Sequence, residues 1–228
     1  MDKQSRSPSL INIYHHLFTR YGPQHWWPAQ TPFEVIIGAI LTQSTSWSNA
    51  EKAINNLKSS RAITPKVLRQ LSVQELARLV HPCGYYNAKA LKLKSFANWL
   101  GEYYSDDLSS LFTHDISFLR QELLSIHGIG QETADSIILY AANKPIFVID
   151  AYTRRITNRI CITVENESYT DYQTFFMNNL PTDARLFNEY HALLVRLAKD
   201  VCHKSPICRH CCLNNICQYF LDWSAGKV

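Results

Sequence analysis

Apolar residues recur three and four positions apart along almost all of this 228-residue chain, the spacing that gathers them on one face of an α-helix. No segment alternates convincingly between apolar and polar residues, as a half-buried β-strand would. The pattern predicts helices over residues 10–18, 33–41, 50–57, 73–80, 89–100, 116–124, 133–142, 151–160, 172–177 and 185–198. We therefore expect an all-α protein.

Proline and glycine residues fall between these segments and indicate where the helices end. Thr64 before Pro65, and Ser72 with Glu75 three residues later, are typical of helix N-caps. The connections are short, so consecutive helices should pack against each other. After residue 198 the helical pattern gives way to a loop that carries cysteines.

Composition narrows the class of protein further. A hydrophobic content of 46% supports a packed core and excludes a disordered chain. No apolar run approaches the roughly 20 residues of a membrane-spanning helix, and the first ten residues lack a signal-peptide stretch. We therefore expect a cytoplasmic protein with no membrane partner, associated with the nucleoid if the source is bacterial. Thiols stay reduced in that compartment, so the seven cysteines favour a metal site over disulfides.

The formal net charge of +4 favours a polyanionic partner without requiring one. Basic residues gather in three places, the first of them at Lys89, Lys92 and Lys94. Each such cluster, taken singly, is more typical of a solvated helix face than of a binding site.

The segment from Leu123 to Ala134 places two glycines, Gly128 and Gly130, between two predicted helices. Glycine at both positions allows positive φ angles and lets backbone amides approach a ligand. A helix that begins at about Gln131 directs free N–H groups at the turn, which suits a phosphate. Ile129 is expected to anchor this hairpin in the core. An ordinary turn between two helices is the alternative for a bare Gly-x-Gly.

The string Gly-Ile-Gly-x-x-Thr-Ala at 128–134, followed by Phe147-Val148-Ile149-Asp150, resembles the helix-hairpin-helix DNA glycosylases of the endonuclease III superfamily. The resemblance extends from roughly Trp26 to Cys217. It implies a two-lobed helical fold, with one domain at 28–140, a second at 1–27 plus 141–228, and DNA across the cleft. In this family the hairpin amides hold DNA backbone phosphate, often with a bound monovalent cation. The DNA contacts so implied are His127, Gly128, Ile129, Gly130, Gln131 and Thr133.

Asp150 follows three apolar residues and precedes a predicted helix, where aspartate is favoured as an N-cap. The resemblance implies that its carboxylate is also the catalytic group, which stabilises positive charge on the sugar and orients the attacking water. Family members that also cut the strand use a lysine just before the Thr-Ala of the hairpin helix. This chain has Glu132 there, which cannot form a Schiff base. We therefore expect base excision with little or no lyase activity.

A second cluster consists of the aromatic residues near Trp26-Trp27-Pro28 and the string Leu-Thr-Gln-x-Thr that leads to Trp47. It resembles the 3-methyladenine glycosylase branch of the superfamily, with Trp26, Trp27, Pro28, Trp47 and Glu132 at the base pocket. Gln43 would then enter the gap left by the flipped nucleotide, although an ordinary polar residue at a helix end is nearly as good an interpretation. An indole holds a cationic alkylated purine better than a neutral base. Trp99 and Trp223 are expected in the core.

Four cysteines at 202–217, with the spacing Cys-x5-Cys-x2-Cys-x5-Cys, could ligate either a [4Fe–4S] cluster or a structural zinc ion. The ligands would be Cys202, Cys208, Cys211 and Cys217, and Cys212 offers a second, less favoured register. The superfamily's commonest spacing has six residues in the first gap and implies the iron–sulfur cluster. Lys204 and Arg209 of this loop can meet DNA phosphates. Cys83 and Cys161 are expected to be buried as small hydrophobic residues.

The function that the sequence predicts is hydrolysis of the N-glycosidic bond of a flipped damaged base, most simply an alkylated purine such as 3-methyladenine. The expected partner is double-stranded DNA with a damaged base, bound by a monomer. Three alternatives stay open at this point. The first is a bifunctional endonuclease III-type glycosylase and AP lyase on oxidised pyrimidines. The second is a non-catalytic DNA-binding protein that keeps the hairpin and an iron–sulfur cluster. The third is an interaction protein stabilised by a zinc ion.

Overall fold

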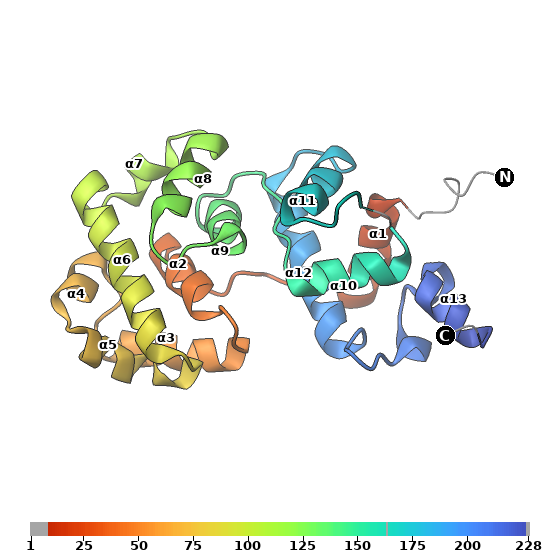
Figure 1. Ribbon diagram of the computed structural model, residues 1–228, viewed down its shortest axis with the longest axis horizontal. Coiled ribbons are helices and arrows are strands. Elements are labelled where there is room, and N and C mark those ends of the chain that lie inside the picture. Colours follow the sequence, from red (N-terminus) through yellow and green to blue (C-terminus); the bar gives the residue numbers. More distant parts are fainter. Residues whose placement is uncertain (1–8, 163, 227–228) are drawn as a thin grey trace. The chain divides into compact units, whose positions relative to one another are not determined.

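The computed structural model describes residues 9–162 and 164–226, and these residues form helices joined by short loops (Figure 1). The chain divides into two compact units. The first, here called the hairpin unit, is Trp27–Lys144. The second, the cysteine-loop unit, combines Met1–Trp26 with Pro145–Val228, apart from residues 1–8, 163 and 227–228, which lie outside the described part.

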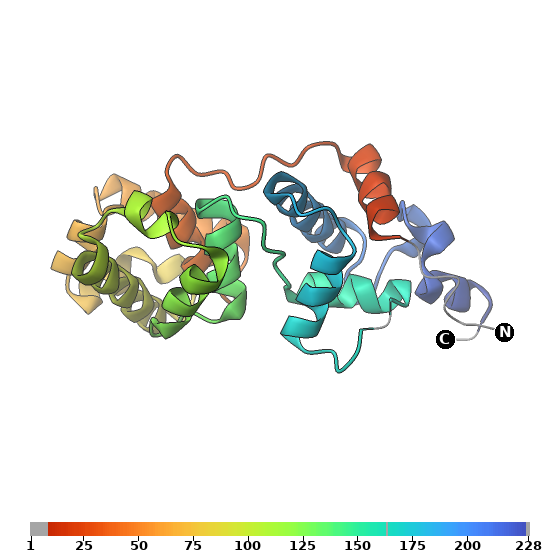
Figure 2. The ribbon, with the colours of Figure 1, turned by 90° about the horizontal axis from the view of Figure 1, so that it is seen from above.

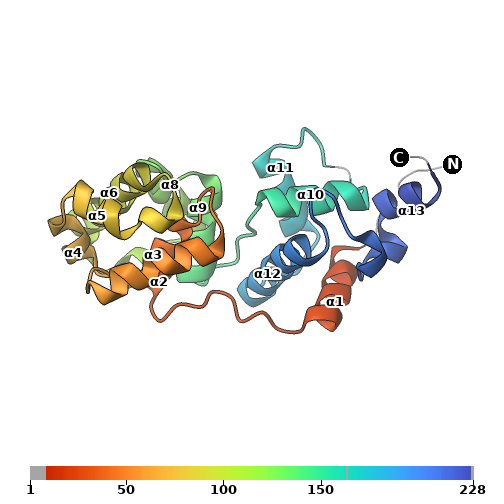
Figure 3. The same cartoon turned by 90° about the horizontal axis from the view of Figure 1, so that it is seen from below.

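The hairpin unit contains most of the helices. They are α2 (Pro32–Leu41), α3 (Trp47–Ser59), α4 (Pro65–Gln70), α5 (Val73–Leu79), α6 (Tyr86–Tyr104), α7 (Leu108–Phe112), α8 (Ile116–Ser125) and α9 (Gln131–Ser136). The long helix α6 packs against α4 and α5, and α2 packs against α3 and α6 (Figures 1 and 3). Helix α9 continues into a single π-helical turn, Ile137–Ala141, which packs on α2.

The cysteine-loop unit is built around α12 (Ala184–Asp200), against which both α1 (Leu10–Tyr21) and α10 (Ala151–Ile160) pack (Figure 2). Helix α11 (Tyr169–Asn178) contributes Phe176, whose ring stacks on Phe147 with a centroid distance of 4.3 Å. Helix α13 (Gln218–Ser224) follows the cysteine loop and packs on α10.

The all-α class predicted from the spacing is confirmed, and the described residues contain no β-strand. Thr64 and Ser72 cap α4 and α5 as predicted, and Glu75 completes a capping box by accepting from the Ser72 backbone N–H. Helices α7 (five residues) and α13 (seven residues) were not predicted from the spacing of apolar residues. No helix of the described part is long and apolar enough to cross a membrane.

Candidate functional site

Asp150 is the N-cap of α10, at the end of the buried segment Ile146–Ile149. Its Oδ1 accepts a hydrogen bond of 2.7 Å from the backbone N–H of Thr153. The side chain keeps 13% of its surface exposed, so it is largely but not completely enclosed. The buried apolar run and the N-cap preference together explain why the chain turns here and where the carboxylate lies.

His191 of α12 is the side chain that faces this carboxylate, with its Nε2 3.5 Å from Asp150 Oδ2. Burial alone would raise the pKa of Asp150, but the His191 side chain and the Thr153 N–H outweigh it and hold the pKa below its ordinary value. Asp150 is therefore a carboxylate at neutral pH. Lys199 also lies on α12. The negative charge of Asp150 raises the pKa of Lys199, but burial of the lysine outweighs this effect, so the net shift of the Lys199 pKa is downward. Sequence reasoning missed His191, because only the packing of α10 on α12 brings it to Asp150.

The hairpin runs from the end of α8 to the start of α9 at Gln131, as predicted. Ile129 is 5% exposed, which confirms its expected place in the core. Gly128 has a φ of +85°, a conformation that favours glycine. The expectation of a positive φ at Gly130 is wrong, because its φ is −95° and its ψ is 179°, an extended backbone that any residue can adopt. His127, Gly130, Gln131 and Glu132 are exposed, whereas Thr133 is buried.

Gln43 contacts the hairpin directly. Its Nε2 donates to the Gly128 carbonyl oxygen at 3.2 Å and to Thr133 Oγ1 at 2.9 Å. The Lys92 ammonium group of α6 donates to Gln43 Oε1, and the stem of Lys92 lies so close to Gly128 that a Cβ there would overlap Lys92 Cγ. The structure thus joins three residues predicted to contact DNA, Gln43, Gly128 and Thr133, into one polar network within the hairpin unit.

The lysines of α6 do not form the solvated face that was expected. Lys89 is 2% exposed, and its ammonium group donates to the carbonyl oxygens of Leu41 (2.9 Å) and Cys83 (2.8 Å). Burial lowers the pKa of Lys89. Lys94 donates to backbone carbonyl groups near the end of α4. These lysines therefore hold loops in place, including the turn that carries Gln43.

An aromatic cluster in the hairpin unit contains two of the predicted pocket residues. The Trp27 ring meets the Trp47 ring edge-on at a centroid distance of 5.6 Å and the Tyr140 ring at 5.4 Å. Trp27 also lies against Gly38 of α2, where a Cβ would be only 2.8 Å from Trp27 Cζ2. Trp27 and Trp47 are half-buried and Pro28 is exposed. Trp26 belongs to the other unit. Two residues of this cluster were missed from the sequence. Tyr140 lies in an apolar run, and Gly38 lies inside a helix, so neither position stands out in the pattern.

The four predicted cysteine ligands, Cys202, Cys208, Cys211 and Cys217, line one small cavity of about 20 Å³. Cys212 lines a different hollow, beside α1. Within the described residues, however, no group of three or more Cys, His, Asp or Glu side chains is arranged closely enough to hold a metal ion.

Arg159 of α10 ties this loop down. Its guanidinium group donates to Cys202 Sγ at 3.2 Å and to the carbonyl oxygens of His203 (2.6 Å) and Lys204 (2.9 Å). The backbone N–H of Leu213 lies 3.4 Å from Cys211 Sγ. Cys202 and Cys211 thus have N–H donors of the kind that stabilise thiolate ligands, so the chemistry of these two cysteines fits a thiolate-bound metal group.

Two expectations about burial are wrong. Trp223 is 44% exposed on α13, a short helix in which no residue is fully buried. Cys161 is exposed, since it is the C-cap of α10 and its φ of +68° turns the chain out of the helix. Cys83 is buried as expected, and Trp99 is half-buried against Phe96.

Comparison with known proteins places this geometry in a family. Residues 37–182 match the sequence model of the HhH-GPD superfamily of base excision DNA repair proteins. The chain belongs to this superfamily. It is a DNA glycosylase, an enzyme that hydrolyses N-glycosyl bonds in base excision repair. The resemblance to the endonuclease III superfamily is thereby confirmed.

One similar protein is "Putative DNA repair glycosylase MJ1434" of Methanocaldococcus jannaschii, which is 42% identical over 216 residues, 94% of this chain and 98% of the relative. Endonuclease III of Thermotoga maritima is 27% identical over 86% of this chain and 87% of its own length. Among solved structures, the H. pylori 3-methyladenine DNA glycosylase MagIII bound to 1,N6-ethenoadenine has a TM-score of 0.75 at 26% identity, covering 84% of this chain and 98% of its own. An endonuclease III–DNA complex, at 18% identity and a TM-score of 0.81 over 95% of this chain and 97% of that one, shares the fold.

Proposed function

We propose that this glycosylase is monofunctional and removes an alkylated purine, such as 3-methyladenine, from double-stranded DNA. The observation that carries the proposal is Asp150, an ionised and partly exposed carboxylate at the N-terminus of α10. As the N-glycosidic bond breaks, positive charge develops on the sugar, and a nearby carboxylate stabilises it. The same carboxylate can orient or deprotonate the attacking water. His191 is then a positioning residue that keeps Asp150 ionised.

The choice of an alkylated purine is supported by the aromatic cluster of Trp27, Trp47 and Tyr140. N-alkylation makes a purine cationic, and an indole ring attracts a cationic ring by about 0.5–2 kcal/mol more than a neutral one. The positive charge also weakens the glycosidic bond, so stacking and one carboxylate suffice without a strong general acid. A solved structure with 26% identity is described as a 3-methyladenine DNA glycosylase.

The absence of lyase activity is proposed from position 132. A strand-cutting family member uses a lysine here as the nucleophile, and a carboxylate cannot form the Schiff base. Glu132 is exposed on the first turn of α9. The product would therefore be an intact strand with an abasic site.

DNA binding is proposed to rest on the hairpin and on Gln43. The exposed His127, Gly130 and Gln131 present the backbone of the hairpin to a phosphate. Gln43 would hydrogen-bond the base left without its partner, after exchanging its bonds to Gly128 and Thr133 for bonds to DNA. Lys204 and Arg209 of the cysteine loop would add phosphate contacts. A monovalent cation at the hairpin and a monomeric enzyme complete the proposal.

We also propose that Cys202, Cys208, Cys211 and Cys217 hold a [4Fe–4S] cluster, with zinc as the less favoured alternative. The cluster would supply structural cross-linking of the loop. Four cysteines on one cavity, with N–H donors from Arg159 and Leu213, support this assignment over the register with Cys212. Iron and acid-labile sulfide analysis of the purified protein, with a brown colour that Cys217→Ser abolishes, is the expected result. Zinc without iron would contradict it.

One assay separates the candidate substrates. The purified protein is incubated with DNA treated by a methylating agent, with DNA that contains thymine glycol and with DNA that contains G·T or G·U mismatches, and the released bases are identified by mass spectrometry. We expect 3-methyladenine as the main product. The mismatch substrates are included because a relative that is 27% identical is named thymine/uracil-DNA glycosylase. Release of thymine or uracil alone would contradict an alkylated purine as the substrate and would indicate a mismatched pyrimidine instead.

A further inference from the structure

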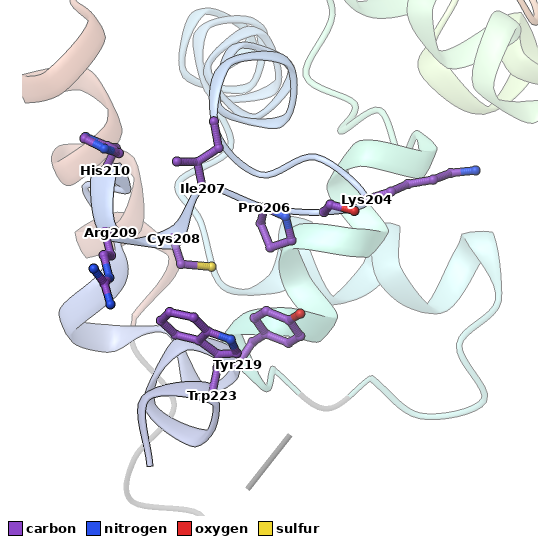
Figure 4. Close-up of a pocket in the computed structure, with 9 residues that line it drawn as sticks. Lys204, Pro206, Ile207, Cys208, Arg209, His210, Tyr219 and Trp223 are labelled. Carbon is purple, nitrogen blue, oxygen red and sulfur yellow. The ribbon is translucent and has the colours of Figure 1, made fainter. Parts of the chain in front are cut away.

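The cysteine-loop unit contains a pocket of about 470 Å³, which shares Cys208 with the proposed cluster site and Lys204 and Arg209 with the proposed DNA contacts (Figure 4). One wall is formed by the Tyr219 and Trp223 rings of α13, and the loop residues Pro206 and Ile207 lie across from them. Trp223 is 44% exposed and Ile207 is 49% exposed, so both sides of the pocket present apolar surface to solvent. A volume between about 300 and 1,000 Å³ is typical of sites for small organic groups.

Two cationic side chains, Lys204 and Arg209, line this pocket together with His210 and the proposed cluster ligand Cys208, and no Asp or Glu is among the lining residues. The guanidinium carbon of Arg209 lies 5.8 Å from the centre of the Trp223 ring, and that of Arg159 lies 4.9 Å from the centre of the Tyr219 ring. The pocket therefore offers aromatic surface beside fixed positive charge. A ligand that matches it has a flat ring and a negative group close to that ring.

The pocket is separate from the catalytic carboxylate. Asp150 caps the start of α10, whereas Arg159 lies nine positions further along, at its end. At about 1.5 Å of rise per residue, the two positions are roughly 14 Å apart along the helix. A nucleotide in this pocket would therefore be a different one from the base that is cut out.

We propose that this pocket binds an unpaired nucleotide of a nucleic-acid strand, with the base against Trp223 and Tyr219 and the phosphate at Arg209 and Lys204. A base within a duplex hides its faces in the stack, so only an unpaired base can use the two rings. The inference rests on the proposed phosphate contacts of the loop and adds to them a base-binding function. An acidic polypeptide would satisfy the charges but would not need the flat rings.

The test is fluorescence anisotropy with a short fluorescein-labelled oligothymidylate, which contains no purine and no lesion. Trp223→Ala should weaken binding of the oligonucleotide by about fivefold or more, which corresponds to the loss of one stacked base. The slope of the logarithm of the binding constant against the logarithm of the salt concentration should not change. Trp223→Phe keeps an aromatic ring at this position and should retain most of the wild-type affinity. Arg209→Gln should lower the steepness of that slope by about 0.7, the value for one phosphate contact on a single strand. Tyr103→Ala, a 63% exposed tyrosine of the hairpin unit, is the matched control and should bind as the wild type does.

Equal affinity of the wild type, Trp223→Ala and Tyr219→Leu for the oligonucleotide would overturn the inference. Displacement of the oligonucleotide by polyglutamate, with the same dependence on Trp223, would also overturn it in favour of an acidic polypeptide. Asp150→Asn separates this inference from the proposed function, since it should lose base release and keep the single-strand affinity. A protein that releases no alkylated base but loses single-strand affinity in Trp223→Ala would contradict only the proposed function.

Discussion

Trp27 depends on the absence of a side chain at Gly38, and this dependence gives a quantitative prediction. A Cβ at position 38 would lie 2.8 Å from Trp27 Cζ2, 2.9 Å from Nε1 and 3.0 Å from Cε2. Ordinary contacts between carbon atoms are about 3.5–4.0 Å. The Gly38→Ala substitution therefore forces the indole or α2 to move by roughly 0.7 Å, the difference between these distances.

Two opposing effects set the stability of this variant. Overpacking costs about 1–3 kcal/mol, whereas alanine is better than glycine inside a helix by about 1 kcal/mol. The expected net loss in the free energy of unfolding is thus about 0–2 kcal/mol. Base release should suffer more, by about tenfold or more, because the ring that is proposed to hold the base is displaced.

A double-mutant cycle tests this reasoning by urea unfolding. In the Trp27→Leu background the clash with the indole is gone, so Gly38→Ala should stabilise the protein by about 1 kcal/mol. The coupling energy between the two positions should be about 1–3 kcal/mol. An identical effect of Gly38→Ala in both backgrounds would show that the indole does not rest on Gly38, and the argument would fail.

Three further substitutions test other parts of the account. His191→Gln should raise the pKa of Asp150, because burial is then less opposed, and so move the acidic limb of the release rate to higher pH; an unmoved limb would contradict the role of His191. Glu132→Lys should allow borohydride trapping on abasic DNA, which the wild type should not show efficiently; strong trapping of the wild type would contradict monofunctional chemistry. Lys92→Met keeps the apolar stem but removes the bond to Gln43 Oε1, so amide exchange in the hairpin should quicken about fivefold, and unchanged exchange would contradict the network.

The features that were predictable from the sequence are those set by local chemistry. Helix α9 begins at Gln131 and α10 at Ala151, because a glycine and an aspartate precede them as N-caps. The helical class followed from apolar spacing over many segments. The family followed from one string of residues around the hairpin.

The features that were missed depend on contacts between distant segments. The burial of Lys89 is settled by two carbonyl groups, one at Cys83 just before α6 and one at Leu41, which packing brings to α6 from 48 residues away. The position of His191 beside Asp150 is settled by the packing of α10 on α12. Periodicity reports only which face of a helix is apolar, and it does not say which partner helix that face meets.

The Asp150 carboxylate is proposed to catalyse hydrolysis of the glycosidic bond, and the Asp150→Asn substitution tests this role most directly. Asparagine can still cap α10, so the fold and the DNA affinity should be retained. Under single-turnover conditions on methylated duplex, we expect release of 3-methyladenine to fall by at least about 100-fold, with DNA affinity equal to or higher than that of the wild type. Release at the wild-type rate by a variant that binds DNA normally would contradict the account.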